Sequence, residues 1–171
     1  MAIRPLRMFG DPVLRARAAV VTEYDGALAA LVRDLMDTML DAPGAGLAAP
    51  QIGVGRRVCC YHVGGVLGRV VNPELVLSRD TQVGLEGCLS IPDLRYDVTR
   101  AMTVPVRGRD LHGDTLALEG TGLLARVFQH ETDHLDGVLF LDRLDRETRR
   151  QAMRDMRDAD PVGQSVARRS S

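Results

Sequence analysis

The chain has 171 residues, 45% of them hydrophobic, and its 22 basic and 23 acidic residues leave a formal net charge of −1. This length suffices for one hydrophobic core and indicates a single domain rather than two. Every basic residue is an arginine, but the acidic residues offset them, so the net charge excludes avid electrostatic binding to nucleic acid.

We expect a cytoplasmic protein with no membrane partner. The first residues lack the apolar run of a signal peptide, and no stretch of about 18 apolar residues is present to span a bilayer. Cys59 and Cys60 are adjacent and are expected on opposite faces of a strand, while Cys88 stands alone. Three such thiols form no disulfide framework and suit a reducing compartment.

The N-terminal part is predicted to contain a short helix near residues 12–18 and then a longer one. Asp25 is suited to cap this second helix, which continues to about Leu40 because leucine and methionine recur along one helical face. Residues 43–55 contain four glycines and two prolines, which a regular helix or a central strand would not tolerate. They are predicted to form a loop with close backbone approach.

The middle of the chain is predicted to form two β-hairpins. Residues 57–63 and 66–71 meet at a Gly-Gly dipeptide, and a short extended segment follows at 75–77. Residues 102–109 and 115–119 alternate in the strand manner on either side of Leu-His-Gly-Asp. Both hairpins predict antiparallel pairing.

The remaining elements are predicted to be helical. Residues 122–135 return to a helical period, and residues 146–159, rich in Arg, Met, Gln and acidic side chains, predict a solvated C-terminal helix. Residues 161–171 are predicted to be a disordered tail, which leaves residues 1–160 as one domain. Together the elements indicate an α+β fold in which antiparallel sheets pack around a central helix, with another helix at the C-terminus.

The strongest chemical signal is the His-Glu-x-x-His unit formed by His130, Glu131 and His134. Two histidines four residues apart share a helical face, and the glutamate beside the first can reach a water on a metal that they bind. Glu131 also borders an apolar stripe, where loss of solvation would raise its pKa. Two ordinary hydrogen-bonded histidines on a half-buried helix are the alternative interpretation.

A metal site of this kind needs a third ligand. Downstream of His134 the acids lie in a charged, loosely patterned segment, where Glu147 is a poor candidate. Upstream, Cys88 stands in Glu-Gly-Cys-Leu-Ser, where a glycine lets the backbone approach an ion closely. One cysteine and two histidines leave a coordination position open, which is typical of a catalytic site. A buried structural Cys88 is the alternative.

Three segments resemble the three motifs of the peptide deformylase family, in the same order. They read Gly-Ala-Gly-Leu-Ala-Ala-Pro-Gln at 44–51, Glu-Gly-Cys-Leu-Ser at 86–90 and Gln-His-Glu-Thr-Asp-His at 129–134. The resemblance covers roughly residues 4–144. It implies hydrolysis of the N-formyl group from the initiator methionine of nascent polypeptides, with release of formate. The helix at 122–135 then becomes the metal-binding centre of the predicted fold.

The resemblance also implies roles for individual residues. The ligands of one divalent metal ion would be Cys88, His130 and His134. Glu131 would take a proton from a water molecule and later deliver it to the departing amine. The side-chain amide of Gln51 and the backbone amide of Leu89 would stabilise negative charge on the former carbonyl oxygen.

A formyl-methionyl substrate needs an apolar pocket beside the metal and backbone donors for the peptide. Ala45 and Gly46 resemble the family's pocket and substrate-strand positions, and Leu123 and Val127 would line the pocket walls. Plain core packing is the alternative for the last two. Ala45 stands where many family members carry a larger aliphatic residue.

Several neighbouring residues are expected to shape this site. Gly84 is small and Arg126 is polar near the expected pocket. Glu86 and Arg100 are expected to form an ion pair that holds the cysteine loop, as similar residues do in the family. Asp133 points away from the metal face by helical phase, so we interpret it as structural.

Ligand identity alone does not choose the metal, because a Cys-His-His site suits zinc, iron(II), nickel or cobalt. The resemblance implies iron(II) in the cell, with zinc, nickel or cobalt in purified protein. It also implies formyl-methionyl nascent peptides as partners. We expect a monomer with no specific nucleic-acid partner. Transient ribosome contact through the C-terminal helix is weighed against simple solvation of its mixed charges.

Two other functions compete with deformylation. A peptidase of the His-Glu-x-x-His type is disfavoured by the upstream cysteine and the lack of a downstream ligand. A non-catalytic metal-binding module of the same fold is disfavoured because Glu131 and Gln51 are both present. Incubation with formylated and unformylated peptides distinguishes the three.

Overall fold

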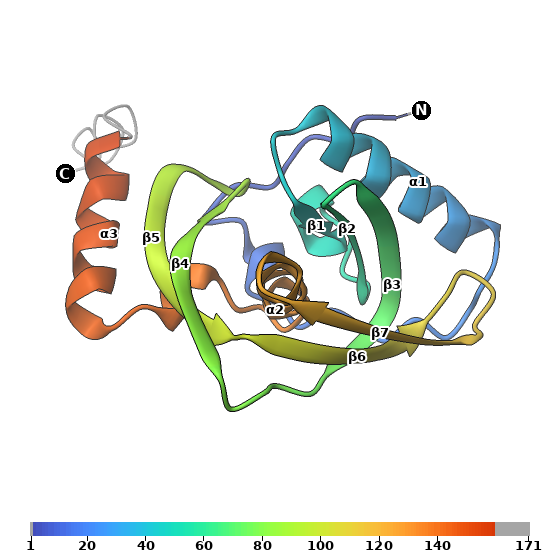
Figure 1. The fold of residues 1–171 in the computed structure, drawn as a ribbon. Helices are drawn as coiled ribbons and strands as arrows, with labels where there is room; N and C mark the ends of the chain where they lie inside the picture. The colour runs from blue at the N-terminus through green and yellow to red at the C-terminus, as the bar shows by residue number, and fades with distance from the viewer. Residues whose placement is uncertain (1, 160–171) are drawn as a thin grey trace, which may run out of the picture.

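The computed structural model describes residues 2–159 (Figure 1). Its helices are α1 Gly26–Asp41, α2 Leu123–Leu135 and α3 Arg146–Ala159. Its strands are β1 Gly46–Ala48, β2 Val58–Val63, β3 Val66–Leu75, β4 Thr81–Cys88, β5 Ile91–Ala101, β6 Thr103–Arg109 and β7 Thr115–Thr121. Short 3-10 turns occur at Pro12–Leu14, Ala49–Ile52 and Phe140–Arg143. The tail predicted at 161–171 lies outside the described residues.

The strands form two antiparallel sheets around α2. One sheet has the order β1-β2-β3-β6-β7, and β4 pairs with β5 in the other. α2 contacts strands of both sheets, and Figure 1 shows it nearly end-on at the centre of the molecule. This arrangement confirms the predicted α+β fold with a central helix. No helix within residues 2–159 has both the length and the apolar character needed to cross a bilayer.

The central helix is held by its apolar face. Ala125, Phe128 and Leu135 are buried in a cluster with residues of β2, β3 and β6. The ring of Tyr61 on β2 meets the Phe128 ring edge-on, with centroids 5.1 Å apart. Gly122 precedes the helix at a φ of 56°, a left-handed conformation that favours glycine. The opposite face of α2 is therefore free to carry polar chemistry toward β4.

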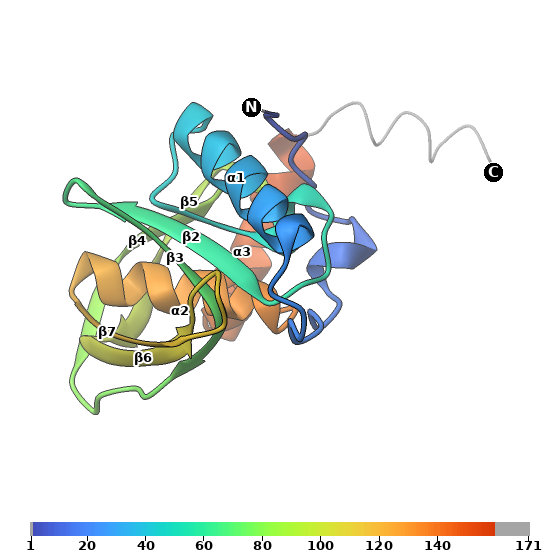
Figure 2. The same cartoon turned by 90° about the vertical axis from the view of Figure 1, so that its right-hand side faces the viewer.

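Helix α1 covers the other face of the larger sheet (Figure 2). The Asp25 side chain accepts hydrogen bonds from the backbone amides of Ala27 and Leu28, both at 3.0 Å, which confirms the predicted cap. Cys59 lies in the core around α2, while Cys60 lies in the core beneath α1. The two thiols therefore occupy opposite faces of β2, as predicted.

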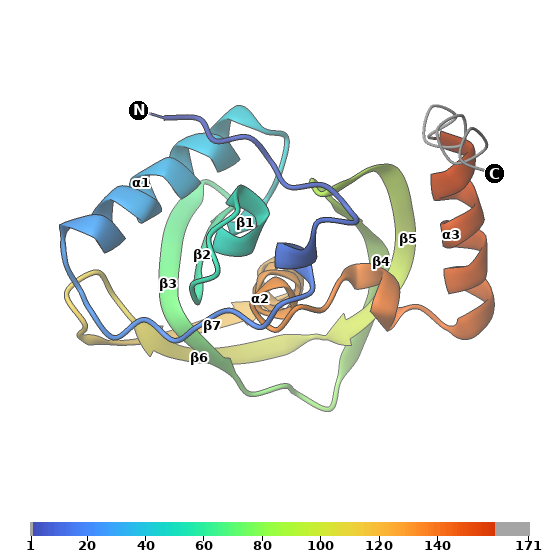
Figure 3. The ribbon, with the colours of Figure 1, turned by 180° about the vertical axis from the view of Figure 1, so that it is seen from behind.

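The N-terminal segment is hydrogen-bonded to the turn that follows β1 and to the turn that follows β4. It crosses the molecule before α1, as Figure 3 shows from behind. The Arg7 amide donates to the Gln51 carbonyl at 2.7 Å, and the Phe9 amide donates to the Ser90 carbonyl at 2.8 Å. The helix predicted near residues 12–18 is only a single 3-10 turn, Pro12–Leu14.

Helix α3 has the predicted bounds but is not solvated on all sides. Ala152 is completely buried, and Met153 and Met156 pack against the same cluster as Ile91 of β5. Apolar side chains at this spacing lie on one helical face, which docks the helix on the smaller sheet. The prediction of a solvated helix is therefore wrong for this face.

Other departures concern the strands. β4 and β5 were not predicted at all, although Leu94, Tyr96 and Val98 alternate with polar residues in the strand manner. The glycine-rich segment contains β1 and a 3-10 turn rather than only a loop, and β1 is tolerated because it is an edge strand. β3 runs unbroken to Leu75, with an irregularity at Asn72, whose φ is 50°.

Candidate metal centre

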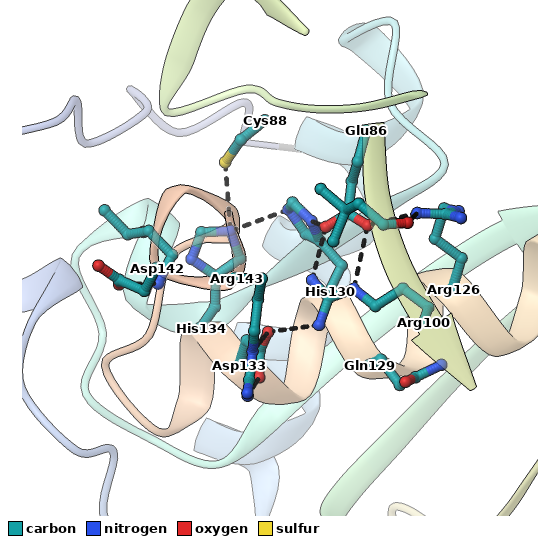
Figure 4. Close-up of polar contacts among 12 residues, drawn as sticks. Glu86, Cys88, Arg100, Arg126, Gln129, His130, Asp133, His134, Asp142 and Arg143 are labelled. Atoms are coloured by element: carbon teal, nitrogen blue, oxygen red, sulfur yellow. Dashed lines mark hydrogen bonds and ion pairs between the residues drawn. The ribbon is translucent and has the colours of Figure 1, made fainter. Parts of the chain in front are cut away.

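Three side chains that can bind a metal converge between α2 and the end of β4 (Figure 4). The Nε2 atoms of His130 and His134, one helical turn apart, are separated by 3.2 Å. Cys88 ends β4, and its Sγ lies 3.2 Å from His134 Nε2. All three ligand atoms lie within 4.8 Å of one another. One ion about 2.0–2.3 Å from each atom can bridge such a set.

The surroundings of these ligands fit a divalent cation. Burial and the nearby His130 lower the pKa of His134 well below its usual value, which favours the neutral imidazole that a metal ligand needs. Within residues 2–159, two buried polar side-chain atoms have no hydrogen-bond partner, Glu131 Oε2 and His134 Nδ1. An unpartnered carboxylate oxygen beside a thiol and two imidazoles suits a site that also holds water.

Glu86 fixes the orientation of the first histidine. One carboxylate oxygen accepts from His130 Nδ1 at 2.7 Å and from Arg100 Nη2 at 2.6 Å. The other accepts from Arg100 Nε at 3.1 Å and from Arg126 Nη1 at 2.9 Å. Burial opposes the charged form, but hydrogen bonds with His130 and Arg100 hold the pKa of Glu86 well below its usual range. The His130 ring is thereby turned with Nε2 toward the other ligands.

Asp133 of α2 connects this helix to β5 and to the 3-10 turn Phe140–Arg143, on the side away from the candidate ligands. Its carboxylate accepts from Arg100 Nη1 at 2.7 Å and from Arg143 Nη2 at 2.6 Å. Arg100 therefore joins Glu86 to Asp133 across β5 and α2 (Figure 4). The structure confirms both the predicted Glu86–Arg100 ion pair and the structural position of Asp133.

Glu131 is packed against β1. Burial raises the pKa of its carboxyl group to about 7. A Cβ atom added to Gly46 would lie only 2.4 Å from Glu131 Oε1, so this approach requires glycine. The predicted direction of the pKa shift is confirmed, and its cause is the loss of solvent that the sequence pattern indicated.

Gln51 and Leu89 both lie beside Cys88. The Gln51 Oε1 atom accepts from the Ala48 amide at 2.9 Å, which orients its Nε2 toward Ser90 Oγ at 3.2 Å and Cys88 Sγ at 3.6 Å. Leu89 follows Cys88 in the tight turn between β4 and β5. The structure thus brings together two loops that are 37 residues apart. Ser90 is a contact that the sequence did not reveal.

A cleft of about 440 Å³ opens onto these groups. Of the ten predicted site residues, all but the deeply buried His134 line it, namely Ala45, Gly46, Gln51, Cys88, Leu89, Leu123, Val127, His130 and Glu131. Leu123 is 58% exposed, whereas Val127 also belongs to the core around α2. Val127 therefore both lines the cleft and packs in the core.

The sequence was compared with known families and structures. A family model described as polypeptide deformylase matches residues 3–150. The chain belongs to the polypeptide deformylase family. This finding confirms the family that the three sequence motifs indicated, and polypeptide deformylases are enzymes, which identifies the chain as a hydrolase.

Individual deformylases are similar over nearly the whole chain. A peptide deformylase of Acidothermus cellulolyticus is 56% identical over 171 residues, which cover 100% of this chain and 95% of the relative. Peptide deformylase 1 of Corynebacterium efficiens is 53% identical over 94% of this chain and 98% of its own. A crystal structure of a peptide deformylase from Legionella pneumophila superposes with a TM-score of 0.87 at 40% identity, covering 95% of this chain and 98% of that one.

Arg126 is the main site residue whose contact the sequence did not predict. It lies on the histidine side of α2 and its guanidinium meets Glu86 on β4, 40 residues away in the chain. A polar residue among Leu123, Val127 and His130 on one helical face was the available signal. Periodicity could place it near the cleft, but its partner depends on the unpredicted strand β4.

Proposed function

We propose that this chain removes the N-formyl group from the initiator methionine of nascent polypeptides in the cleft between β1, β4 and α2. The observation that carries the proposal is the meeting of Cys88, His130 and His134 with the buried carboxylate of Glu131 in a chain of the deformylase family. Water adds to the formyl carbon, the C–N bond breaks, and formate and a free amino terminus are released.

Cys88, His130 and His134 would hold one divalent cation. When bound, such an ion acidifies a water molecule and polarises the formyl carbonyl group. The family resemblance supports iron(II) in the cell, and zinc, nickel or cobalt suit the same ligands in purified protein. A thiol ligand with access to solvent makes the site sensitive to oxidation.

Glu131 carries the proton. A pKa of about 7 suits a group that must accept a proton and return it near neutral pH. Its carboxylate takes a proton from the attacking water and delivers it to the amine nitrogen as the C–N bond breaks. The close contact with Gly46 holds the carboxylate in place for both transfers.

Gln51 and Leu89 stabilise the charge that develops on the former carbonyl oxygen. The Gln51 amide is suited to this role because Ala48 fixes its oxygen and leaves the NH₂ group directed toward Cys88. The backbone N–H of Leu89 supplies a second donor from the adjoining turn. Loss of one such donor typically lowers kcat by on the order of a hundredfold or more.

The substrate binds along the glycine-rich edge. Gly46 on β1 offers backbone groups to the peptide, while Ala45, Leu123 and Val127 provide the apolar walls for the methionine side chain. We place the enzyme in the cytoplasm as a monomer. The mixed charges on the exposed face of α3 favour solvation of that face over ribosome docking. Co-sedimentation with ribosomes, compared between the native chain and an Arg146→Glu, Arg150→Glu variant, tests that contact.

The deciding experiment measures formate release by the metal-loaded protein. Formyl-Met-Ala is the substrate, and unformylated Met-Ala and longer peptides are the controls. We expect formate from the formylated peptide alone. Cleavage of internal amide bonds with no formate would instead support a peptidase, and no reaction at any metal loading would support a non-catalytic module.

A further inference from the structure

An arginine with free donor groups lies in the wall of the cleft. Arg126 is on α2, one turn before His130, and only 7% of its surface is exposed. Its Nη1 atom donates to Glu86 Oε2 and to the Val98 carbonyl, both at 2.9 Å. No partner within residues 2–159 is found for Nε or Nη2. One edge of the guanidinium is therefore fixed and the other is available.

Arg126 lines the cleft that a substrate side chain would enter, and its unpartnered nitrogens are reached by solvent. Neither Nε nor Nη2 is among the fully buried polar atoms that lack a partner, and Arg126 lines the cleft with Leu123 and Ala45. Nη2 packs close to Gly84 of β4, where an added Cβ atom would lie only 3.3 Å away, so glycine at this position accommodates the guanidinium. The apolar wall is thus interrupted by N–H donors that contact solvent.

The guanidinium of Arg126 is also linked to the candidate metal ligands through Glu86. Glu86 accepts from His130 Nδ1 on one oxygen and from Arg126 Nη1 on the other. Because one carboxylate joins the two residues, the guanidinium is within a side-chain length of a proposed metal ligand. A methionine side chain whose formyl group lies at the metal would therefore reach toward Arg126.

The substrate side chain that reaches Arg126 must match N–H donors that lie beside the Glu86 carboxylate. A carboxylate in the substrate side chain would be attracted by the Arg126 guanidinium but repelled by Glu86, with which Arg126 is already paired, so the two effects offset. A thioether sulfur is neutral but is only a weak hydrogen-bond acceptor. Oxidation of methionine to its sulfoxide adds a polar oxygen without adding charge. A sulfoxide is therefore the form of the expected side chain that matches free N–H donors beside a carboxylate.

We propose, on the basis of the proposed function, that the enzyme also deformylates peptides that begin with N-formyl-methionine sulfoxide. The sulfoxide oxygen accepts hydrogen bonds from the free N–H groups of Arg126. Arg126 is thereby a specificity-determining residue, which extends the substrate class from formyl-methionyl to oxidised formyl-methionyl chains.

The test compares kcat/KM for formyl-Met-Ala, formyl-methionine-sulfoxide-Ala and formyl-norleucyl-Ala. Wild-type enzyme is expected to use the sulfoxide peptide within about tenfold of the methionyl peptide. Arg126→Leu is expected to lower the ratio of sulfoxide to norleucyl turnover by about tenfold to a hundredfold, the usual worth of a hydrogen bond to a charged group. Arg126→Lys should restore part of it. Arg107→Leu, on β6 away from the cleft, is the matched control.

The outcomes separate this proposal from its alternatives. If Arg126 only holds Glu86, its loss lowers turnover of all three peptides equally, and an unchanged ratio overturns the proposal. Wild-type enzyme that uses formyl-Met-Ala but not the sulfoxide peptide also overturns it. Failure to use either peptide counts against the proposed function itself.

A milder variant and a binding measurement cover the case in which Arg126→Leu does not fold. Gly84→Ala keeps the arginine but crowds Nη2, so it is expected to lower the sulfoxide ratio as well. Titration calorimetry of the metal-loaded enzyme with the products methionine-sulfoxide-Ala and norleucyl-Ala should show tighter binding of the first. Equal binding and an unaffected ratio in Gly84→Ala would overturn the proposal.

Discussion

Replacement of Gly46 by alanine should disable the enzyme by displacing one carboxylate. The new Cβ atom would lie 2.4 Å from Glu131 Oε1, 2.8 Å from its Cδ and 2.9 Å from its Cγ. Comfortable contacts between carbon atoms are about 3.5–4.0 Å, so the glutamate must move by about 1 Å. A misplacement of that size costs on the order of a hundredfold in rate, or about 2.7 kcal/mol in transition-state stabilisation.

The assay is steady-state formate release from formyl-Met-Ala, with the bound metal quantified in the same samples. Gly46→Ala should retain metal and lose kcat. Gly55→Ala is the matched control in the same segment, because no atom lies within 4 Å of its added Cβ. Wild-type kcat in a metal-loaded Gly46→Ala enzyme would refute the reasoning. A rise in KM alone would show that the added methyl group blocks the peptide strand and not the carboxylate.

Four further changes test the site. Glu131→Gln should keep metal, measured by elemental analysis, but lose turnover by several orders of magnitude; normal turnover would remove Glu131 from the mechanism. Because burial raises the pKa of Glu131 to about 7 and the base must be ionised, kcat/KM should fall as pH decreases. The midpoint should lie at or below pH 7, since a bound cation favours the carboxylate, and a midpoint above pH 8 would contradict this role. Iodoacetamide should label only Cys88 in native metal-free protein, as mass spectrometry can show, because burial raises the pKa of both β2 thiols. Arg100→Met should lower the free energy of unfolding in urea by about 3 kcal/mol, since it removes a shared partner of two buried carboxylates. Arg143→Met, whose side chain is 47% exposed, should cost less.

The features that the sequence predicted well are local ones. The period of residues 122–135 placed α2 within one residue of its observed start, and the capping residue Asp25 placed α1. Helix geometry alone then put His130 and His134 on one face. These inferences succeed because the interactions involved span only about one helical turn.

β4 was not predicted because its apolar side chains are exposed and its polar side chain Glu86 is buried, the reverse of the usual strand pattern. Val83 and Leu85 point outward and are each 68% exposed, while Glu86 and Gly84 face the interior. The inward face of this strand lies toward the candidate metal centre rather than a hydrophobic core, so the alternation of apolar and polar residues does not distinguish its buried face from its exposed face.

Contacts between distant segments required either a family resemblance or the folded structure. Cys88 lies 46 residues before His134, and no periodicity connects them. The residues themselves offered Cys88 as a third ligand beside a structural alternative; the resemblance favoured the ligand role and supplied Gln51. It did not supply the contact between Arg126 and Glu86, because that contact depends on which side chains flank each motif in this particular chain.

The Glu86 carboxylate links the proposed metal ligand His130 to Arg126 in the wall of the cleft. Nothing in the sequence indicated that these two side chains share a partner. Through one oxygen Glu86 orients His130, and through the other it anchors Arg126 in the wall of the cleft. Arg100 supports both interactions, because it donates to both carboxylate oxygens of Glu86 and also to Asp133 on α2. A change at Arg126 is consequently expected to act on His130, a proposed metal ligand, as well as on the bound substrate side chain. Only the ratio between substrates, in which the shared effect on His130 cancels, isolates its role in specificity.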